Sequence, residues 1–180
     1  MSRIILVTGG ARSGKSTFAE ELYSNKKDVV YIATARVTDN EMKDRILFHQ
    51  KQRPEEWITI EANYRLSEIV NERKNYLLDC ITVLTSNIMF DITGESDKIP
   101  PEIQVKLEKT VVDEISLLID RVKQAGKNLV MVTNEVGNSI VPENNVARIY
   151  RDIAGRVNQK IAKMCSEVYL VTCGIPLRLK

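Results

Sequence analysis

The eight residues 9–16 constrain this chain more than any other stretch. They read Gly-Gly-Ala-Arg-Ser-Gly-Lys-Ser and match the phosphate-loop pattern G-x-x-x-x-G-K-[ST] without a gap. The apolar, β-branched run at residues 4–7 predicts a strand buried on both faces of a parallel sheet, and residues 16–23 predict a helix. This strand-loop-helix setting favours a phosphate site over a Gly-rich turn that happens to contain a lysine.

The residue types in the loop suit the binding of a nucleotide. Three glycines let the backbone bend around an anion, and amide groups at the start of the helix point at phosphate oxygens. Lys15 is expected to reach the β- and γ-phosphates, and the Ser16 hydroxyl to hold Mg²⁺. The predicted nucleotide-binding residues of the loop are Gly9, Gly10, Ala11, Arg12, Ser13, Gly14, Lys15 and Ser16.

A second acidic signature follows about sixty residues later. Tyr76, Leu77 and Leu78 predict an apolar strand, and Asp79 comes directly after it. In phosphate-loop proteins an aspartate at such a position holds Mg²⁺ opposite the hydroxyl of the loop. The pattern is weak alone, but with the loop upstream it predicts that Ser16 and Asp79 share a metal ion.

Composition limits the classes of protein to which this chain can belong. A chain of 180 residues, 43% of them hydrophobic, predicts a single domain over residues 1–180. The net charge of +2 gives no reason to expect a nucleic-acid partner. No apolar run reaches membrane-spanning length and no signal-peptide region precedes the first strand, so a cytoplasmic protein is expected. Cys80, Cys165 and Cys173 lack metal-ligand spacing and are expected to be reduced thiols in or near the core.

The segment after the second predicted strand carries further candidates. The strand at residues 29–32 ends in Ala33, Thr34 and Ala35, small side chains that suit either ligand approach or packing. A capping box, with Glu41 three residues after Thr38, predicts a helix over residues 39–53.

That helix would place Arg45, His49 and Arg53 on one face. His49 is the only histidine of the chain, and from spacing alone it is either a solvated side chain or a nucleophile beside two cationic groups.

The rest of the chain alternates strands and helices. Strands are predicted at residues 57–61 (an edge strand ending in Glu61), 129–133, 168–172 and 175–180, and helices at 65–72, 81–90, 101–126 and 145–165, with a polar loop at 91–99. The apolar stripe of the 101–126 helix is expected to be core or a subunit contact. The expected fold is an α/β, three-layer, RecA-like phosphate-loop NTPase domain with a mostly parallel sheet of about six or seven strands.

Several motifs together resemble one family over nearly the whole chain. They are the phosphate loop, Tyr31-Ile32-Ala33-Thr34, the segment 39–57, Asn134-Glu135-Val136-Gly137, the segment 140–144 and the segment 150–159. The family is the bifunctional adenosylcobinamide kinase and adenosylcobinamide-phosphate guanylyltransferase of cobalamin biosynthesis. The resemblance implies phosphorylation of adenosylcobinamide by ATP or GTP, and then GMP transfer from GTP to the new phosphate, giving adenosylcobinamide-GDP and pyrophosphate.

The resemblance also implies roles for single residues. The guanylylated histidine of the family falls on His49, Mg²⁺ is the implied metal, and some relatives carry Glu at the position of Asp79. Family members look like homotrimers that bind the corrinoid near subunit boundaries. The implied nucleotide contacts beyond the loop are Ala33, Thr34, Ala35, Gln50, Lys51, Gln52, Arg53, Glu61 and Asp79.

Two other interpretations remain open from the sequence. A monofunctional small-molecule kinase needs only the loop and Asp79, and it would carry no covalent nucleotide on His49. A nucleotide-dependent binding protein would catalyse nothing. The strand at residues 129–133 is not followed by the guanine-recognition pattern of regulatory GTPases, which counts against a switch of that type.

Overall fold

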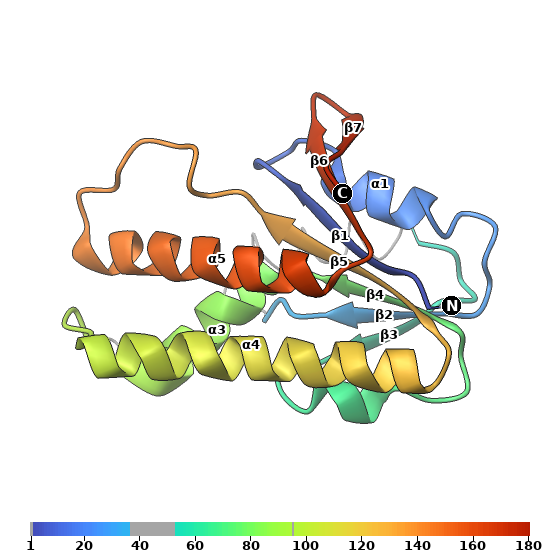
Figure 1. Ribbon diagram of the computed structural model, residues 1–180, viewed down its shortest axis with the longest axis horizontal. Helices are drawn as coiled ribbons and strands as arrows, with labels where there is room; N and C mark the ends of the chain where they lie inside the picture. The colour runs from blue at the N-terminus through green and yellow to red at the C-terminus, as the bar shows by residue number, and fades with distance from the viewer. Residues whose placement is uncertain (1, 37–52, 95) are drawn as a thin grey trace.

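The computed structural model describes all residues except 1, 37–52 and 95. Its elements are β1 (Ile4–Gly9), α1 (Lys15–Glu21), β2 (Val29–Ala33), β3 (Ile58–Glu61), the 3₁₀ helix η1 (Leu66–Ile69), β4 (Asn75–Asp79), α3 (Ile81–Thr93), α4 (Pro101–Gln124), β5 (Asn128–Asn134), α5 (Asn145–Met164), β6 (Glu167–Thr172) and β7 (Ile175–Arg178) (Figure 1). The helix predicted for residues 39–53 lies outside the described residues except for Arg53.

A single seven-stranded sheet forms the centre of the fold, in the order β3-β2-β4-β5-β1-β6-β7. All neighbouring strands are parallel except β6 and β7, and the parallel strands point toward the left in Figure 1. The strand that leads into the phosphate loop, β1, is separated from the strand that ends in Asp79 by β5 alone. At the usual spacing between strands, β1 and β4 lie about 10 Å apart.

Helices cover both faces of the sheet because the strands alternate their buried side chains. Ile4 and Leu6 of β1 pack into the larger core with α3, α4 and α5, whereas Ile5 and Val7 pack on the opposite face with α1. Both faces of β1 are therefore buried, as expected for a central parallel strand. The result is the predicted three-layer α/β domain.

Two elements differ in length from the prediction. The helix predicted for residues 65–72 is only the short η1, because Val70 takes an extended backbone and the Asn71 N–H donates to the hydroxyl of Tyr76 at 2.8 Å. Helix α3 continues through Asp91 into the predicted loop. The Asp91 carboxylate accepts two hydrogen bonds from the Arg36 guanidinium, both at 2.7 Å, so this polar residue is satisfied on the helix surface.

The long helix α4 shows which of two predicted roles its apolar stripe has. Leu107, Val111, Ile115, Leu118 and Val122 are each 0% exposed and belong to the core of their own chain. The prediction of a core stripe is therefore confirmed, and its use as a subunit contact is wrong.

Two arginines of α5 have partners within the chain. Arg156 donates to the carboxylate of Glu108, and Arg148 donates to the carbonyls of Pro142 and Glu143.

The structure also bears on the three cysteines and on membrane-spanning helices. Cys80 and Cys165 are buried free thiols as predicted, but Cys173 is exposed in the turn between β6 and β7, so its predicted place near the core is wrong. Within the described parts of the chain, no helix combines the length and the apolar character needed to cross a membrane.

Candidate active site

The phosphate loop begins where β1 ends, and steric crowding explains why its first residue is glycine. A Cβ on Gly9 would lie 2.4 Å from the carbonyl oxygen of Val171 on the neighbouring strand β6 and 2.6 Å from Oγ of Ser13. Both distances are far below contact, so only glycine fits between β6 and the loop. A Cβ on Gly10 would meet no other atom within 4 Å, so Gly10 faces open space.

The second half of the loop leads into α1. Gly14 has φ 92°, which side chains rarely adopt, and a Cβ there would lie 3.1 Å from Cα of Gly174. Lys15 folds back over the loop and donates from Nζ to the carbonyl of Gly10 at 3.1 Å. The N–H groups of the first helical turn have no intrahelical acceptors, so those of Lys15 and Ser16 are available to an anion. The loop thus presents an ammonium group and backbone donors on one side.

Asp79 ends β4 at the same edge of the sheet. It is level with Ala33 of β2 and Val132 of β5 in the strand register. Its Oδ2 accepts a hydrogen bond from the Tyr31 hydroxyl at 2.9 Å. Burial and the nearby Asp79 raise the pKa of Tyr31 well above its ordinary value, so the phenol stays protonated and donates.

The donor chemistry of this edge fits Mg²⁺. Among the described residues, Oδ1 of Asp79 accepts no hydrogen bond and is available to a ligand, and Ser16 adds a hydroxyl at the loop. The described part of the chain has no cluster of three or more His, Cys, Asp or Glu side chains that could hold a metal. A site of one carboxylate and one hydroxyl suits Mg²⁺, which usually takes its other ligands from water and substrate phosphates.

Arg53 lies on the α1 side of the sheet, against Tyr31, whose hydroxyl binds Asp79. Its Cζ lies 3.3 Å from the centroid of the Tyr31 ring, a close cation–π contact, and its side chain is only 8% exposed. Its Nε lies 3.9 Å from Oε1 of Glu20 on α1. Burial raises the pKa of Glu20 to about 7, and the attraction of Arg53 opposes this rise only in part. Glu20, Arg53, Tyr31 and Asp79 thus follow one another from α1 to the sheet edge, joined by an ion pair, a cation–π contact and a hydrogen bond.

The other predicted nucleotide contacts differ in exposure to solvent. Ala33 and Glu61 are level with each other at the ends of β2 and β3, and Glu61 is exposed at this edge. Thr34 is 0% exposed, and its hydroxyl accepts from the N–H of Cys80 at 2.8 Å and donates to the carbonyl of Cys80 at 2.9 Å. Packing therefore accounts for the Thr34 side chain. Ala35 is partly buried beside it.

Four predicted site residues lie outside the described residues: His49, Gln50, Lys51 and Gln52. The described residues therefore bring together the phosphate loop, Asp79 and Arg53 at one edge of the sheet.

Sequence reasoning quoted Asn134 and Asn158 within family motifs but assigned no site role to this group of polar residues beside the loop. Asn134 ends β5 opposite Gly9, and its Nδ2 donates to Oγ1 of Thr82 at 2.7 Å. Asn158 of α5 donates to the carbonyl of Asn134 at 3.1 Å. The available signal was an asparagine directly after a buried strand. Glu20 was missed too, because nothing in its spacing shows that this side of α1 faces Arg53.

The sheet order, the loop and the acidic strand end define this chain as an α/β phosphate-loop protein with a RecA-like fold. A solved structure of a KaiC-like protein, PH0186 from the hyperthermophilic archaeon Pyrococcus horikoshii OT3, is similar with a TM-score of 0.51. The superposition covers 93% of this chain and 71% of that one. At 12% sequence identity this likeness supports the fold alone.

The sequence comparisons identify the family. The chain belongs to the cobinamide kinase / cobinamide phosphate guanyltransferase (CobU) family of bifunctional enzymes, whose sequence profile matches residues 5–179.

Two curated relatives are similar over almost their whole length. The bifunctional adenosylcobalamin biosynthesis protein CobU of Escherichia coli K12 is 44% identical, over 98% of this chain and 99% of the relative. The bifunctional adenosylcobalamin biosynthesis protein CobP of Pseudomonas aeruginosa is 32% identical, over 97% of this chain and 96% of the relative.

Proposed function

We propose that this chain catalyses two successive transfers to one corrinoid. In the first, the hydroxyl oxygen of the aminopropanol arm of adenosylcobinamide attacks the γ-phosphorus of ATP or GTP. The new phosphorus–oxygen bond forms as the bond to the β-phosphate oxygen breaks, the hydroxyl proton passes to solvent, and a nucleoside diphosphate leaves.

In the second transfer a neutral imidazole nitrogen of His49 attacks the α-phosphorus of GTP. A phosphorus–nitrogen bond forms, the bond to the bridging oxygen breaks, and pyrophosphate leaves. A phosphate oxygen of adenosylcobinamide phosphate then attacks the same phosphorus and displaces His49. The products are adenosylcobinamide-GDP and the free enzyme.

The observation that carries this proposal is the meeting of the phosphate loop and Asp79 at one edge of the sheet. Lys15 and the loop amides would stabilise the transferring γ-phosphoryl group in the first reaction and the leaving pyrophosphate in the second. Ser16 and Asp79 would hold Mg²⁺, which neutralises phosphate charge when bound. Both reactions place their negative charge on the same donors, so one nucleotide site can serve both.

Arg53 has a supporting role in this proposal. It directly follows Gln50, Lys51 and Gln52, which the family resemblance assigns to the nucleotide, and its side chain stacks on Tyr31. A fixed Arg53 would anchor the end of that segment beside Asp79.

Intact mass spectrometry tests the covalent step. Wild-type protein incubated with GTP and Mg²⁺ should gain the mass of one GMP, and acid should remove it, because phosphorus–nitrogen bonds are acid-labile. His49→Ala should gain nothing but should still phosphorylate adenosylcobinamide with ATP. This retained kinase activity is the control for folding. A wild-type protein that transfers phosphate and gains no GMP would reduce the function to that of a kinase.

We also propose that the chain assembles as a homotrimer in the cytoplasm, as the family resemblance implies. The α4 stripe and two of the α5 arginines are engaged within the chain, so the contacts must use other surfaces. Sedimentation equilibrium of the purified protein tests the assembly. A mass of one or two chains at micromolar concentration would contradict it.

A further inference from the structure

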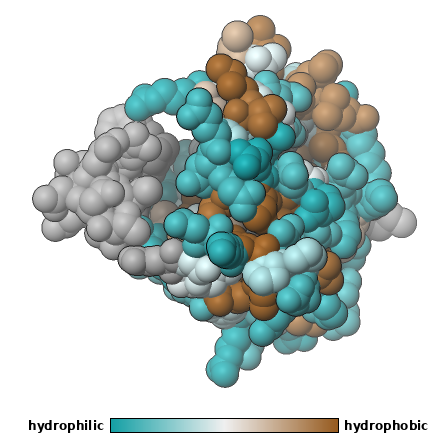
Figure 2. All heavy atoms as spheres, turned by 90° about the vertical axis from the view of Figure 1, so that its left-hand side faces the viewer, coloured by the Kyte–Doolittle hydropathy of each residue, from teal (hydrophilic) through white to brown (hydrophobic). Residues whose placement is uncertain are grey.

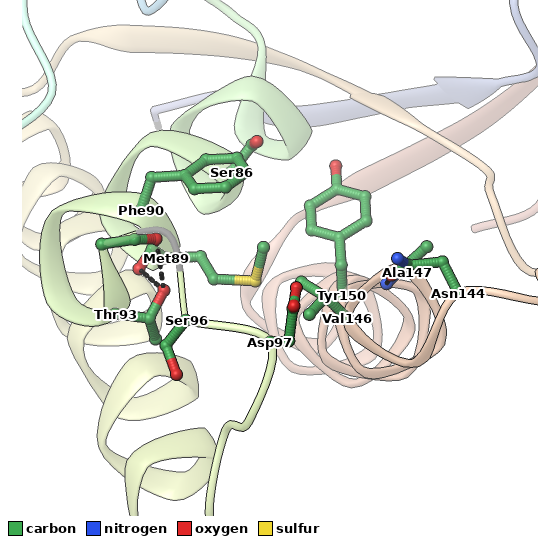
Figure 3. A pocket seen from close by; sticks show the side chains of 11 residues that line it. Ser86, Met89, Phe90, Thr93, Ser96, Asp97, Asn144, Val146, Ala147 and Tyr150 are labelled. Carbon is green, nitrogen blue, oxygen red and sulfur yellow. Dashed lines mark hydrogen bonds between the residues drawn. The ribbon is translucent and has the colours of Figure 1, made fainter.

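A cavity lies on the other face of the sheet from α1. It is a cavity of about 460 Å³ between α3, the residues that follow it, and the first turns of α5. Ser86, Met89 and Phe90 come from α3, and Val146 and Tyr150 from α5, with the Met89 side chain extending toward Tyr150 (Figure 3). Nothing in the catalytic scheme above uses these residues.

The walls of this cavity are apolar and its margin is polar. Phe90 is 53% exposed although Ile88 and Met89 directly before it are buried, so an aromatic ring faces solvent here. The Tyr150 hydroxyl is already used, because it donates to the carbonyl of Thr82 at 2.9 Å, and this bond fixes the ring. Asn144 accepts the N–H of Ala147 through Oδ1 at 3.0 Å, and among the described residues its amide NH₂ has no partner, so it can donate to a ligand. An apolar hollow with a few polar groups is typical of small-molecule sites.

The cavity is close to the nucleotide site. Helix α3 starts directly after Asp79 and Cys80, and Met89 lies seven residues beyond Thr82, which is about 10 Å along a helix. Thr82 is in turn bound to Asn134, the residue opposite Gly9 of the loop. Figure 2 shows the side toward which the parallel strands point, and hydrophobic surface lies in the middle of it among hydrophilic residues. Ser86, which also lines the cavity, lies only four residues beyond Thr82, about 6 Å along the helix, so the near wall of the cavity lies close to the residues that contact the loop.

We propose that this cavity binds one edge of the corrin ring of the acceptor while its hydroxyl arm reaches the phosphate loop. This proposal rests on the proposed function. The ring edge carries methyl groups and amide side chains, which match an apolar wall with a polar margin. The arm from the ring to the reacting hydroxyl has about seven bonds and spans about 8 Å when extended. That length is greater than the distance of about 6 Å along α3 between Ser86 at the near wall and Thr82, which binds Asn134 opposite Gly9 of the loop.

The position of the cavity favours a part of the corrinoid over the base and sugar of the nucleotide at this place. The nucleotide is anchored by its phosphates at the loop, on the α1 side, whereas the cavity lies on the α3 and α5 side. The whole macrocycle is too large for 460 Å³, so only one edge would enter and the rest would lie outside the cavity. Phe90, exposed at the mouth, would cover the face of the inserted edge.

The test uses two variants of the cavity and one matched control. Phe90→Ala removes the exposed wall, and Ala147→Trp fills the space from α5. Leu117→Ala is the control, because Leu117 is 57% exposed on α4 and does not line the cavity. Binding of adenosylcobinamide is followed by its own absorbance in equilibrium dialysis, with a non-hydrolysable GTP analogue present. GMP loading from GTP without corrinoid is measured on the same proteins by intact mass.

Both cavity variants should bind adenosylcobinamide about tenfold more weakly or worse, because each removes or blocks an apolar contact of aromatic size. Their GMP loading without corrinoid should stay within about twofold of wild type, since the first half of the transfer needs no acceptor. Leu117→Ala should match wild type in both measurements. The split between corrinoid affinity and GMP loading is what a merely structural defect would not produce.

Other outcomes overturn the proposal in distinguishable ways. Unchanged corrinoid binding in both cavity variants would place the corrinoid elsewhere. Parallel loss of GMP loading would assign the cavity to the nucleotide or to folding. A changed subunit number with unchanged corrinoid binding would mean that a second copy of the chain covers it. A wild-type protein that neither binds adenosylcobinamide nor transfers any group would remove the proposed function itself.

Discussion

Replacing Gly9 with alanine tests whether close packing against β6 requires glycine at this position, in addition to its place in the phosphate-loop motif. The new Cβ would lie 2.4 Å from the carbonyl oxygen of Val171, which is about 1 Å closer than an ordinary contact. The neighbour is backbone of β6 and cannot rotate away, so β1 and β6 must separate or the loop must move. Overpacking of this kind costs about 1–3 kcal/mol, and a backbone neighbour puts Gly9→Ala at the upper end.

A loss of about 3 kcal/mol should lower the melting temperature by about 6–12 °C in a domain of this size. The matched control is Gly10→Ala, because a Cβ there meets nothing within 4 Å and Gly10 does not need a positive φ. It should melt at the wild-type temperature or slightly above, since alanine reduces the entropy of the unfolded chain. Thermal unfolding by circular dichroism measures both, with and without GTP. Equal melting temperatures of the two variants would refute the steric argument.

Three further predictions concern residues behind the site and in the core. Because burial raises the pKa of Glu20 from 4.5 to about 7, the contribution of Glu20 to stability is complete below pH 4.5 and is lost as the pH rises through about 7. Glu20→Gln should therefore remove up to about 3 kcal/mol of the pH dependence of the unfolding free energy, which urea unfolding at pH 5 and 8 measures. Tyr31→Phe removes the hydrogen bond to Asp79 and should raise the Mg²⁺ concentration for half-maximal nucleotide binding about fivefold, with little change in melting temperature. Leu118→Ala should cost about 2–5 kcal/mol of unfolding free energy, whereas its exposed neighbour Leu117→Ala should cost less than about 0.5 kcal/mol.

The sequence predicted the parts of the fold that depend on local pattern. The motif at residues 9–16 placed a strand before it and a helix after it, and both exist as β1 and α1. Apolar runs likewise located β2, β4, β5 and β6, because strands buried on both faces show no polar alternation. The acidic end of β4 could be expected near the loop because parallel strands end at one edge of the sheet.

The environment of Arg53 could not be predicted from spacing. A helical interpretation grouped it with Arg45 and His49, facing the phosphates. The described structure shows its side chain nearly buried on the ring of Tyr31 and beside Glu20. These partners come from β2 and α1, and their approach depends on how α1 packs across the sheet. Local periodicity contains no information about that crossing.

Polar residues inside buried elements were a second limit. Thr34 was open to two interpretations, and its hydroxyl is fully used by the backbone of Cys80. The hydrogen bond from Asn134 to Thr82 joins residues 52 positions apart. Alone, Asn134 is typical of a strand end and Thr82 of a helix start. Their importance appears only when the sheet order places β5 between β1 and β4.

The two faces of the sheet suggest how one nucleotide site could act twice on the same acceptor. The loop and Arg53 lie on the α1 side, the cavity at Phe90 lies on the α3 and α5 side, and Asp79 lies at the edge between them. If the ring edge stays in the cavity, phosphorylation lengthens the arm by one phosphate and carries the new nucleophile further toward the nucleotide. The phosphorylated acceptor should then lose affinity in Phe90→Ala by the same factor as adenosylcobinamide. Equilibrium dialysis of both corrinoids measures this, and a loss confined to one of them would mean that the ring moves between the two reactions.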